Sequence, residues 1–251
     1  MPSFDLRGKT AAVTGCNAGL GAAMAEALAA AGCDIVGINR TPPDSTVARI
    51  ARRGRRFIDI RADLGATSAI ADIVPQIERS VSTIDILVNN AGIIRRQDAL
   101  AMTMSDWDDV LDVNLKAVFF LSQSFARHFV AHKVPGKIIN VASMLSFQGG
   151  VRVASYAASK SGLLGLTRLL ANEWAKHGIN VNGIAPGYML TKNTEELRSD
   201  PQRYNEILGR IPAGRWGEPE DLGGAVVFLA SRSSDYVHGH TLPVDGGWLA
   251  R

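Results

Sequence analysis

The stretch KTAAVTGCNAGLGAAMAEALAAAGCDIVGIN, residues 9–39, decides the fold of this chain. A short apolar run is followed by a glycine-rich turn, an alanine-rich segment and a second apolar run. This order predicts a buried strand, a helix and a second strand parallel to the first, and such crossovers are right-handed. The chain therefore opens with the β-α-β unit that is typical of nucleotide-binding proteins.

The turn in this unit, TGCNAGLG at residues 14–21, carries Gly15, Gly19 and Gly21. Glycine permits a tight turn and a close approach of backbone to a pyrophosphate, and the helix that follows presents free N–H groups and a positive dipole end. A glycine-rich turn made only for packing is the alternative. Because the turn stands between a predicted strand and a predicted helix, we expect it to bind phosphate through Gly15, Asn17, Gly19 and Leu20.

The ends of the second and third predicted strands are expected to hold the adenosine. The acid that often follows the second strand is absent, and Asn39 and Arg40 stand there instead. Asn39 can hydrogen-bond a ribose hydroxyl without repelling a 2′-phosphate, and Arg40 can either pair with that phosphate or point into solvent. Asp63 and Leu64 end the third strand, where they can meet the adenine edge, although Asp63 can equally cap a helix. NAD and NADP both remain open as cofactors.

The rest of the chain continues the same alternation. A fourth strand ends in Asn90, Ala91 and Gly92, which suit a cofactor floor. A helical stretch over residues 105–132, opened by a Ser/Asp cap, contains the amide of Asn114 in apolar surroundings. A fifth strand, a long helix over 155–178, a sixth strand ending at Pro186 and Gly187, and a last helix and strand follow in that order. We expect one α/β domain over 1–251, a Rossmann-type doubly wound parallel sheet of about seven strands with helices on both faces.

Composition limits the classes of function. The 251 residues are 46% hydrophobic and 20% charged, with a net charge of +3, so a nucleic-acid partner is weakly supported. Cys16 and Cys33 are predicted to be buried free thiols, and no His/Cys/carboxylate cluster suggests a metal. The amino-terminal residues form no apolar signal region and no apolar run is long enough to cross a bilayer, so a cytoplasmic protein without a membrane partner is expected.

The stretch SMLSFQGGVRVASYAASK, residues 143–160, carries the candidate chemistry. Tyr156 and Lys160 are four residues apart in a predicted helix, so their side chains lie on one face, one turn apart. An ammonium beside a phenol favours the phenolate, so we expect the pKa of Tyr156 to fall from its usual value near ~10. Ser143 follows the fifth strand, where its hydroxyl could bond the reacting oxygen. An ordinary Tyr/Lys pair on a helix surface is the alternative.

Taken in order, these motifs resemble the short-chain dehydrogenase/reductase family over nearly the whole chain. They are TGxxxGxG at 14–21, NNAG at 89–92, Asn114, Ser143, YxxxK at 156–160 and PG at 186–187. The resemblance implies hydride transfer with NAD or NADP. It also implies that Tyr156 is the general acid/base, that Ser143 orients the reacting oxygen and that Lys160 holds the nicotinamide ribose and lowers the pKa of Tyr156. Asn114 would position a water in a proton relay, Thr191 would contact the carboxamide, and residues 184–187 would back the nicotinamide ring. Members usually pack as homotetramers through the central helices and the last helix and strand.

Narrower stretches, among them NNAGIIRRQDAL at 89–100 and IPAGRWGEPEDL at 211–222, resemble family members that act on sugar acids of the 2-deoxy-D-gluconate or 2-dehydro-3-deoxy-D-gluconate type. Such a substrate carries a carboxylate, which an arginine fork binds well. We expect Arg95, Arg96 or Arg152 to anchor it, unless these arginines are solvated or lie between subunits. Weaker candidates for the pocket lining are Met144, Gln148, Tyr188 and Trp174. Packing is the alternative for Trp174, which lies in the long helix. The polar segment 188–216 is predicted to be a mobile lid.

Two rival functions share parts of this pattern. A 3-oxoacyl-carrier-protein reductase, or another polyol or ketone reductase of the family, would carry the same catalytic motifs, and a basic surface could serve an acidic carrier protein. A catalytically silent dinucleotide-binding regulator would keep only the cofactor motifs. The complete Ser143, Tyr156, Lys160 and Asn114 set argues against the regulator.

Overall fold

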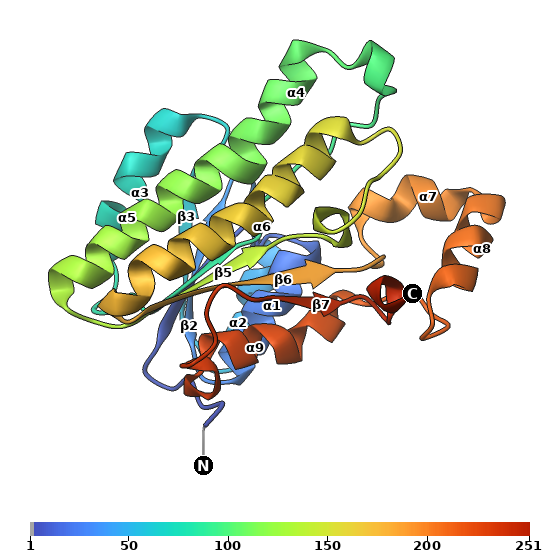
Figure 1. Ribbon diagram of the computed structural model, residues 1–251. Helices are drawn as coiled ribbons and strands as arrows, with labels where there is room; N and C mark the ends of the chain where they lie inside the picture. Colours follow the sequence, from blue (N-terminus) through green and yellow to red (C-terminus); the bar gives the residue numbers. More distant parts are fainter. Residues whose placement is uncertain (1–2) are drawn as a thin grey trace.

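The structure of the protein is a computed structural model that describes residues 3–251. Within that range seven parallel strands form one sheet in the order β3-β2-β1-β4-β5-β6-β7 (Figure 1). The strands are β1 (Thr10–Thr14), β2 (Asp34–Asn39), β3 (Phe57–Arg61), β4 (Ile86–Asn89), β5 (Gly136–Val141), β6 (Ile179–Pro186) and β7 (Thr241–Val244). The strand order reverses between β1 and β4, so the predicted doubly wound sheet is confirmed.

Helices cover both faces of the sheet (Figure 1). They are α1 (Gly19–Ala30), α2 (Asp44–Arg52), α3 (Ile73–Glu78), α4 (Met104–Leu111), α5 (Ala117–His132), α6 (Ala154–Trp174), α7 (Glu195–Ser199), α8 (Pro201–Arg210) and α9 (Gly223–Ala230). One face carries α1, α2 and α9, and the other carries α3, α5 and α6. This arrangement makes two hydrophobic cores, one on each side of the sheet.

The two cores use different side chains. On the first face the small residues of α1 let the helix approach the sheet, and Met24 and Leu28 fill the space toward α9. On the second face Ile77 of α3 packs with Phe125 and Phe129 of α5, whose rings meet edge to face with centroids 6.2 Å apart. Burial of each such side chain contributes about 1.5–3 kcal/mol, so both faces of the sheet are firmly covered.

The stretch 105–132 differs from its prediction at its start. The N-cap is Thr103, whose hydroxyl accepts a hydrogen bond from the backbone N–H of Asp106 at 3.1 Å, whereas Ser105 lies inside the first turn. The predicted Ser/Asp cap is therefore wrong by two residues. The helix continues from α4 to α5 through a π-helical turn, Asp112–Lys116, which contains Asn114. Such turns are frequent at functional sites.

The segment predicted as a lid folds into α7 and α8, which stand apart from the sheet beyond the end of β6 (Figure 1). A small apolar cluster attaches it, formed by Met144, Ile207, Ile211, Trp216 and Trp248. Tyr188 packs into this cluster, with its ring centroid 4.8 Å from that of Trp248. The mobility of the segment stays a prediction.

Two smaller expectations concern the cysteines and the membrane. Cys16 and Cys33 are both buried and free, as predicted. Burial raises the pKa of the Cys16 thiol to about 11 and that of the Cys33 thiol to about 12. Among the helices of residues 3–251, none combines the length and apolar content needed to cross a membrane.

Candidate active site

A cavity of about 860 Å³ opens at the carboxyl ends of the strands from β1 to β6. This volume lies in the range of ~300–1,000 Å³ that small-molecule sites occupy, and the position is the switch point where ligands bind in open α/β sheets. Predicted residues that line it are Gly15, Asn17, Gly19, Leu20, Arg40, Asp63, Leu64, Asn90, Ala91, Gly92, Ser143, Tyr156, Lys160, Pro186, Gly187 and Thr191. Segments far apart in the sequence therefore converge on one space.

The glycine turn is shaped to admit a phosphate. Gly15 and Gly19 have positive φ angles of 64° and 55°, which favour glycine. A Cβ at Gly21 would lie 2.3 Å from the carbonyl oxygen of Gly15, so no side chain fits there. The residue before α1, Ala18, has no side chain that could cap the helix, which leaves first-turn N–H groups facing the cavity. These features fit the pyrophosphate of a dinucleotide.

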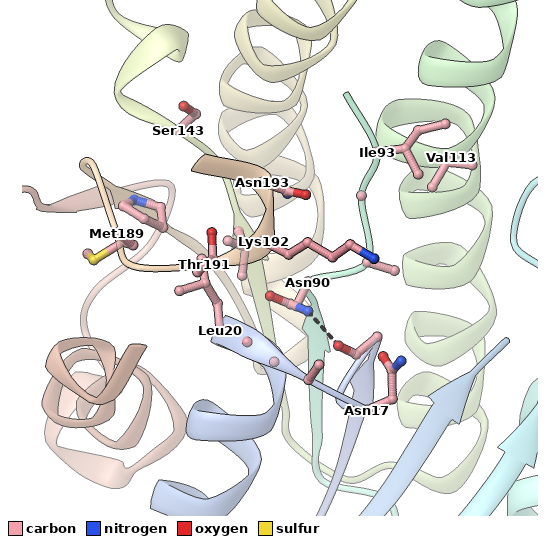
Figure 2. A pocket seen from close by; sticks show the side chains of 18 of the residues that line it. Asn17, Leu20, Asn90, Ile93, Val113, Ser143, Met189, Thr191, Lys192 and Asn193 are labelled. Carbon is pink, nitrogen blue, oxygen red and sulfur yellow. Dashed lines mark hydrogen bonds between the residues drawn. The ribbon is translucent and has the colours of Figure 1, made fainter. Parts of the chain in front are cut away.

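Asn90 braces this turn from the neighbouring strand. Its amide nitrogen donates to the carbonyl oxygens of Thr14 at 2.9 Å and Gly15 at 3.1 Å, and Figure 2 shows the amide pointing at the turn. The backbone N–H groups of Asn90 and Ala91 donate to the hydroxyl of Thr14 at 2.9 and 2.8 Å. Asn90 thus shapes the phosphate turn. Thr14 is a positioning residue that the sequence analysis did not single out, although it opens the TGxxxGxG motif.

At the adenosine end, Arg40 lies at the cavity, whereas its neighbour in the sequence, Asn39, does not. Arg40 is exposed and lines the cavity, with its guanidinium 4.0 Å from the carboxylate of Asp63. Asp63 also accepts a hydrogen bond from the N–H of Gly65 at 2.9 Å, so it both lines the cavity and caps a turn. The helix-capping alternative weighed for Asp63 is wrong, because Ala66 is the N-cap of the 3-10 helix that follows, Thr67–Asp72. Contact with the adenine edge stays a prediction.

Asn39 lies away from the cavity, contrary to its prediction as a ribose-binding residue. Its side chain is only 1% exposed and its amide nitrogen donates to the carboxylate of Asp59 at 3.0 Å. The reason is the alternation of strand side chains, which turns Asn39 to the same face as Gly37, above Cys16. The position where many dinucleotide-binding folds carry an acid is thus occupied by a buried amide.

The three residues with candidate chemistry meet in the cavity. Ser143 follows β5, and its hydroxyl accepts from the N–H of Leu145 at 3.1 Å and hydrogen-bonds Tyr156. Tyr156 lies in the first turn of α6 and Lys160 lies one turn later. The Lys160 Nζ atom is 5.7 Å from the centroid of the Tyr156 ring and donates to the carbonyl oxygen of Val141 at 2.6 Å. The end of β5 and the start of α6 therefore hold a hydroxyl, a phenol and an ammonium together.

The pKa of Tyr156 shifts in the direction opposite to the prediction. Burial raises it, and the hydrogen bond from Ser143 and the positive charge of Arg96 only partly oppose that effect. Burial also lowers the pKa of Lys160 to about 8, so the side chain is still mostly an ammonium at neutral pH. The phenol accordingly keeps its proton at neutral pH, which is the form that a general acid requires.

Asn114 is fully buried and lies outside the lining of the cavity. Its side-chain oxygen accepts from the N–H of Ile93 at 2.9 Å, and its nitrogen donates to the carbonyl of Ile93 at 2.9 Å and to Ser159 at 3.2 Å. The amide thus ties the π-helical turn to the segment after β4 and to α6. A role in a water relay stays a prediction.

The predicted substrate residues, all within the described part of the chain, lie outside the lining of this cavity. Arg95 pairs with Asp109 at 3.2 Å and with Asp106 at 3.5 Å, and Arg152 pairs with Asp98 at 3.4 Å. Met144 and Tyr188 belong to the apolar cluster under the lid, and Gln148 accepts a long hydrogen bond of 3.5 Å from Arg210. The structure places Arg95 and Arg152 in ordinary ion pairs, because nearby acids compete for them.

Arg96 is the exception among these arginines. Its guanidinium donates to the carbonyl oxygen of Asn193 at 3.0 Å and lies 3.8 Å from Glu196, so it bridges to the lid. Burial raises the pKa of both Tyr156 and Tyr188, and the charge of Arg96 partly opposes that rise at each of them. Of the three predicted arginines, Arg96 is thus the one whose charge influences the pKa of Tyr156.

The segment 188–216, predicted as a lid, contributes residues to the cavity that the sequence analysis did not identify. Met189, Leu190, Lys192, Asn193, Thr194, Glu195 and Arg198 line the cavity together with Thr191. A Cβ added to Gly19 would lie 3.9 Å from the methyl group of Thr191, so the lid reaches the glycine turn (Figure 2). The only signal in the sequence was their position directly after Pro186 and Gly187.

Comparison with known proteins gives concordant matches. A family model described as enoyl-(acyl carrier protein) reductase matches residues 15–249. The chain is 61% identical over 251 residues to the 2-dehydro-3-deoxy-D-gluconate 5-dehydrogenase of Escherichia coli (strain K12), covering 100% of this chain and 99% of that protein.

Solved structures are similar along their whole length. A protein from Agrobacterium tumefaciens with bound NADP is 55% identical, with a TM-score of 0.94 and coverage of 99% of each chain. A gluconate 5-dehydrogenase from Burkholderia cenocepacia J2315 in complex with NADP and tartrate is 39% identical, with a TM-score of 0.93, and the match covers 100% of this chain and 98% of that one.

Proposed function

Because the chain belongs to the short-chain dehydrogenase/reductase family, we propose that it transfers a hydride between NAD or NADP and a keto or hydroxy sugar acid of the 2-dehydro-3-deoxy-D-gluconate type. The observation that carries this proposal is the meeting of Ser143, Tyr156 and Lys160 in a cavity that also holds the glycine turn. The 61% identity to a sugar-acid dehydrogenase supports the substrate class.

The chain's own residues supply placement and proton transfer. The glycine turn and the start of α1 bind the pyrophosphate. The nicotinamide supplies or accepts the hydride when it is bound. Ser143 donates a hydrogen bond to the reacting oxygen, and Tyr156 gives a proton to that oxygen in reduction and takes it back in oxidation. Lys160, with its pKa of about 8, holds the ribose and exchanges protons with its surroundings near neutral pH.

Arg96 anchors the substrate carboxylate in this proposal. It is the predicted arginine whose charge reaches Tyr156, whereas Arg95 is held by two aspartates. A charge-assisted hydrogen bond contributes ~1.5–3 kcal/mol, or roughly 10- to 100-fold in affinity. Arg96→Gln should raise KM for the sugar acid by about that factor and leave KM for an uncharged polyol unchanged. Arg95→Gln is the matched control, and equal effects of the two changes would defeat the assignment.

A substrate assay tests the function directly. The purified chain is assayed with 2-dehydro-3-deoxy-D-gluconate, 2-deoxy-D-gluconate and acetoacetyl thioester, each with NAD(H) and NADP(H). We expect the sugar acids to have the highest kcat/KM. If NADP is preferred, Arg40→Gln should weaken the binding of NADP about tenfold and leave the binding of NAD unchanged, since Arg40 lies at the adenosine end of the cavity.

Two other outcomes correspond to the rival functions. A 3-oxoacyl-carrier-protein reductase would be indicated if the thioester were turned over faster than either sugar acid. Dinucleotide binding without turnover of any sugar acid, polyol or ketone would indicate a regulator. Either result would overturn the proposal.

We further propose that the enzyme is a cytoplasmic homotetramer with a closing lid. Free, buried Cys16 and Cys33 suit a reducing compartment. Phe120 of α5 and Leu169 of α6 are 44% and 49% exposed, which suits burial against another copy. Light scattering of the purified chain measures the molar mass of the oligomer in solution, and Leu169→Asp should lower that mass. A monomer at working concentration would contradict the tetramer.

A further inference from the structure

A cluster of metal-ligating side chains lies at the end of the sheet opposite the cavity. Glu78 is the last residue of α3, and His128 and His132 occupy the last turns of α5. One ligand atom from each residue lies within 4.8 Å of the others, and the Nδ1 atom of His128 is 2.6 Å from the carboxylate of Glu78. Because α5 leads into the start of β5, this cluster lies at the amino end of the strands.

The two histidines are arranged as metal ligands usually are. They are four residues apart on one helix, so they share a face, and their ring centroids are 4.2 Å apart. The Nδ1 atom of His132 is 2.9 Å from the backbone carbonyl oxygen of His128. Since a carbonyl only accepts, that nitrogen carries the proton, and in the neutral ring Nε2 is left with a free lone pair. A ring N–H donated to a carbonyl is the usual support of a ligating histidine.

We propose that Glu78, His128 and His132 bind a divalent transition metal of the Zn²⁺ class, with water at the fourth position. Two imidazoles and one carboxylate are a common donor set for this ion. Ligand bonds of about 2.0–2.1 Å in a tetrahedron place ligand atoms roughly 3.3 Å apart, which the exposed side chains of Glu78 and His132 reach by rotation. The carboxyl-terminal end of α5 carries a partial negative charge that favours a cation.

The metal fastens α3 to α5 and takes no part in hydride transfer, because none of its three ligands lines the cavity described for residues 3–251. Its predicted effect is on stability, since an ion that binds only the folded chain raises the unfolding temperature with its concentration. The proposal is therefore independent of the proposed function, and each can fail while the other holds.

Zinc titration of the full-length chain tests the site. The chain is prepared without a histidine tag, treated with chelator, and titrated with Zn²⁺ by calorimetry and by thermal unfolding. We expect one equivalent to bind and the melting temperature to rise. His132→Gln and Glu78→Gln should each weaken binding at least about tenfold, and Co²⁺ should give the visible absorption of a tetrahedral site in the wild-type chain alone.

The matched control is His177→Gln, which removes an exposed histidine outside the cluster. It should leave the affinity for Zn²⁺ unchanged. His132 is the main variant because it is exposed, so its replacement leaves folding and oxidoreductase activity intact. Zinc binding that is equal in the wild type and His132→Gln, or absent from the wild type, would overturn the proposal and leave only a hydrogen bond between Glu78 and His128.

Discussion

The two ends of the sheet place a lysine in different surroundings, Lys160 buried and Lys137 partly buried. At the carboxyl end, Lys160 donates to the carbonyl of Val141, and within residues 3–251 no carboxylate lies in ion-pair range of it. At the amino end, Lys137 bonds the carboxylate of Asp235 at 2.7 Å and the amide oxygen of Asn180 at 3.0 Å. Burial lowers the pKa of both lysines, but Asp235 opposes the shift at Lys137.

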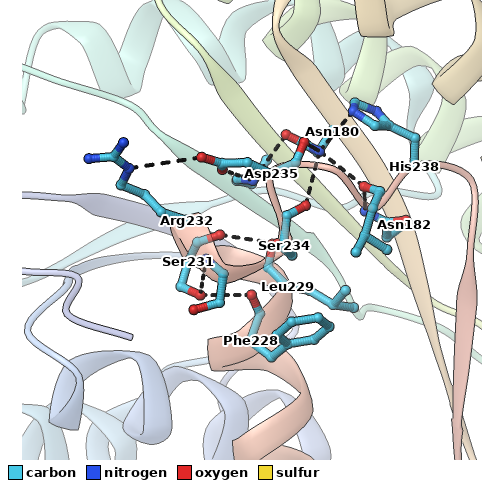
Figure 3. A network of polar contacts seen from close by, with 12 residues as sticks. Asn180, Asn182, Phe228, Leu229, Ser231, Arg232, Ser234, Asp235 and His238 are labelled. Carbon is cyan, nitrogen blue, oxygen red and sulfur yellow. Dashed lines mark hydrogen bonds and ion pairs between the residues drawn. The ribbon is translucent and has the colours of Figure 1, made fainter. Parts of the chain in front are cut away.

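A network of hydrogen bonds within the chain holds polar side chains at the amino end (Figure 3). The amide nitrogen of Asn180 donates to the carbonyls of Asp235 and Val237, each at 3.0 Å, and that of Asn182 donates to the carbonyl of Val237 at 2.8 Å. These bonds hold the segment after α9 against the start of β6. The polar network at the amino end thus stabilises the fold, whereas Ser143, Tyr156 and Lys160 at the carboxyl end face a cavity and are the candidates for chemistry.

The largest expected effect is the loss of the phenol at the carboxyl end. Tyr156→Phe should lower kcat by about 10²–10⁴-fold, because it removes the proton donor. Dinucleotide affinity, measured by fluorescence titration, should change less than about twofold, since the ring remains. Tyr236→Phe is the control, because Tyr236 is fully exposed near the amino end. More than a tenth of the activity left in Tyr156→Phe would contradict the assignment.

The second effect is the loss of dinucleotide binding when a glycine of the phosphate turn is replaced, compared with a glycine of α9. At Gly21→Ala the new Cβ would lie 2.3 Å from backbone and 2.4 Å from the amide of Asn90, so the turn must shift. A cost of about 1–3 kcal/mol is expected from such overpacking, seen as dinucleotide binding weakened about 10- to 100-fold. Gly224→Ala in α9 meets open space and should stabilise the chain by about 0.5 kcal/mol. Unchanged binding in Gly21→Ala would refute the role of the turn.

The third effect is on stability and depends on pH. Since the pKa of Lys160 is about 8 in the folded chain and 10.5 when unfolded, the unfolded chain holds more protons between these values. The cost of burying the ammonium is complete below pH 8 and disappears as the pH rises to 10.5. Lys160→Met should therefore stabilise the chain at pH 7, by at most on the order of 3 kcal/mol, and this gain should vanish near pH 10.5.

Chemical denaturation of both chains across this range measures the difference, in which contributions from Tyr156 and the cysteines cancel. A difference that stays constant with pH would show that Lys160 is not the group whose proton is lost. Lys137→Met is the comparison at the amino end, and its pH dependence should be weaker because Asp235 supports the charge of Lys137.

The order of strands and helices and the motifs of the site could be predicted from the sequence, because they depend on neighbours along the chain. Alternating apolar runs decide which segments are strands, glycines decide where the turn admits a phosphate, and a four-residue spacing puts Tyr156 and Lys160 on one helix face. These signals are local, and the structure has the strands, the turn and the helix that they predict.

Only the tertiary structure decided what depends on packing between distant segments. It turned Asn39 toward Asp59, raised the pKa of Tyr156 through burial, and held Arg95 with acids of α4 while it left Arg96 beside the lid. It also brought Glu78 close to His128, which lies fifty residues later in the chain, and to His132. Burial and long-range contact determine charge state and partnership, and neither can be read from spacing along the chain.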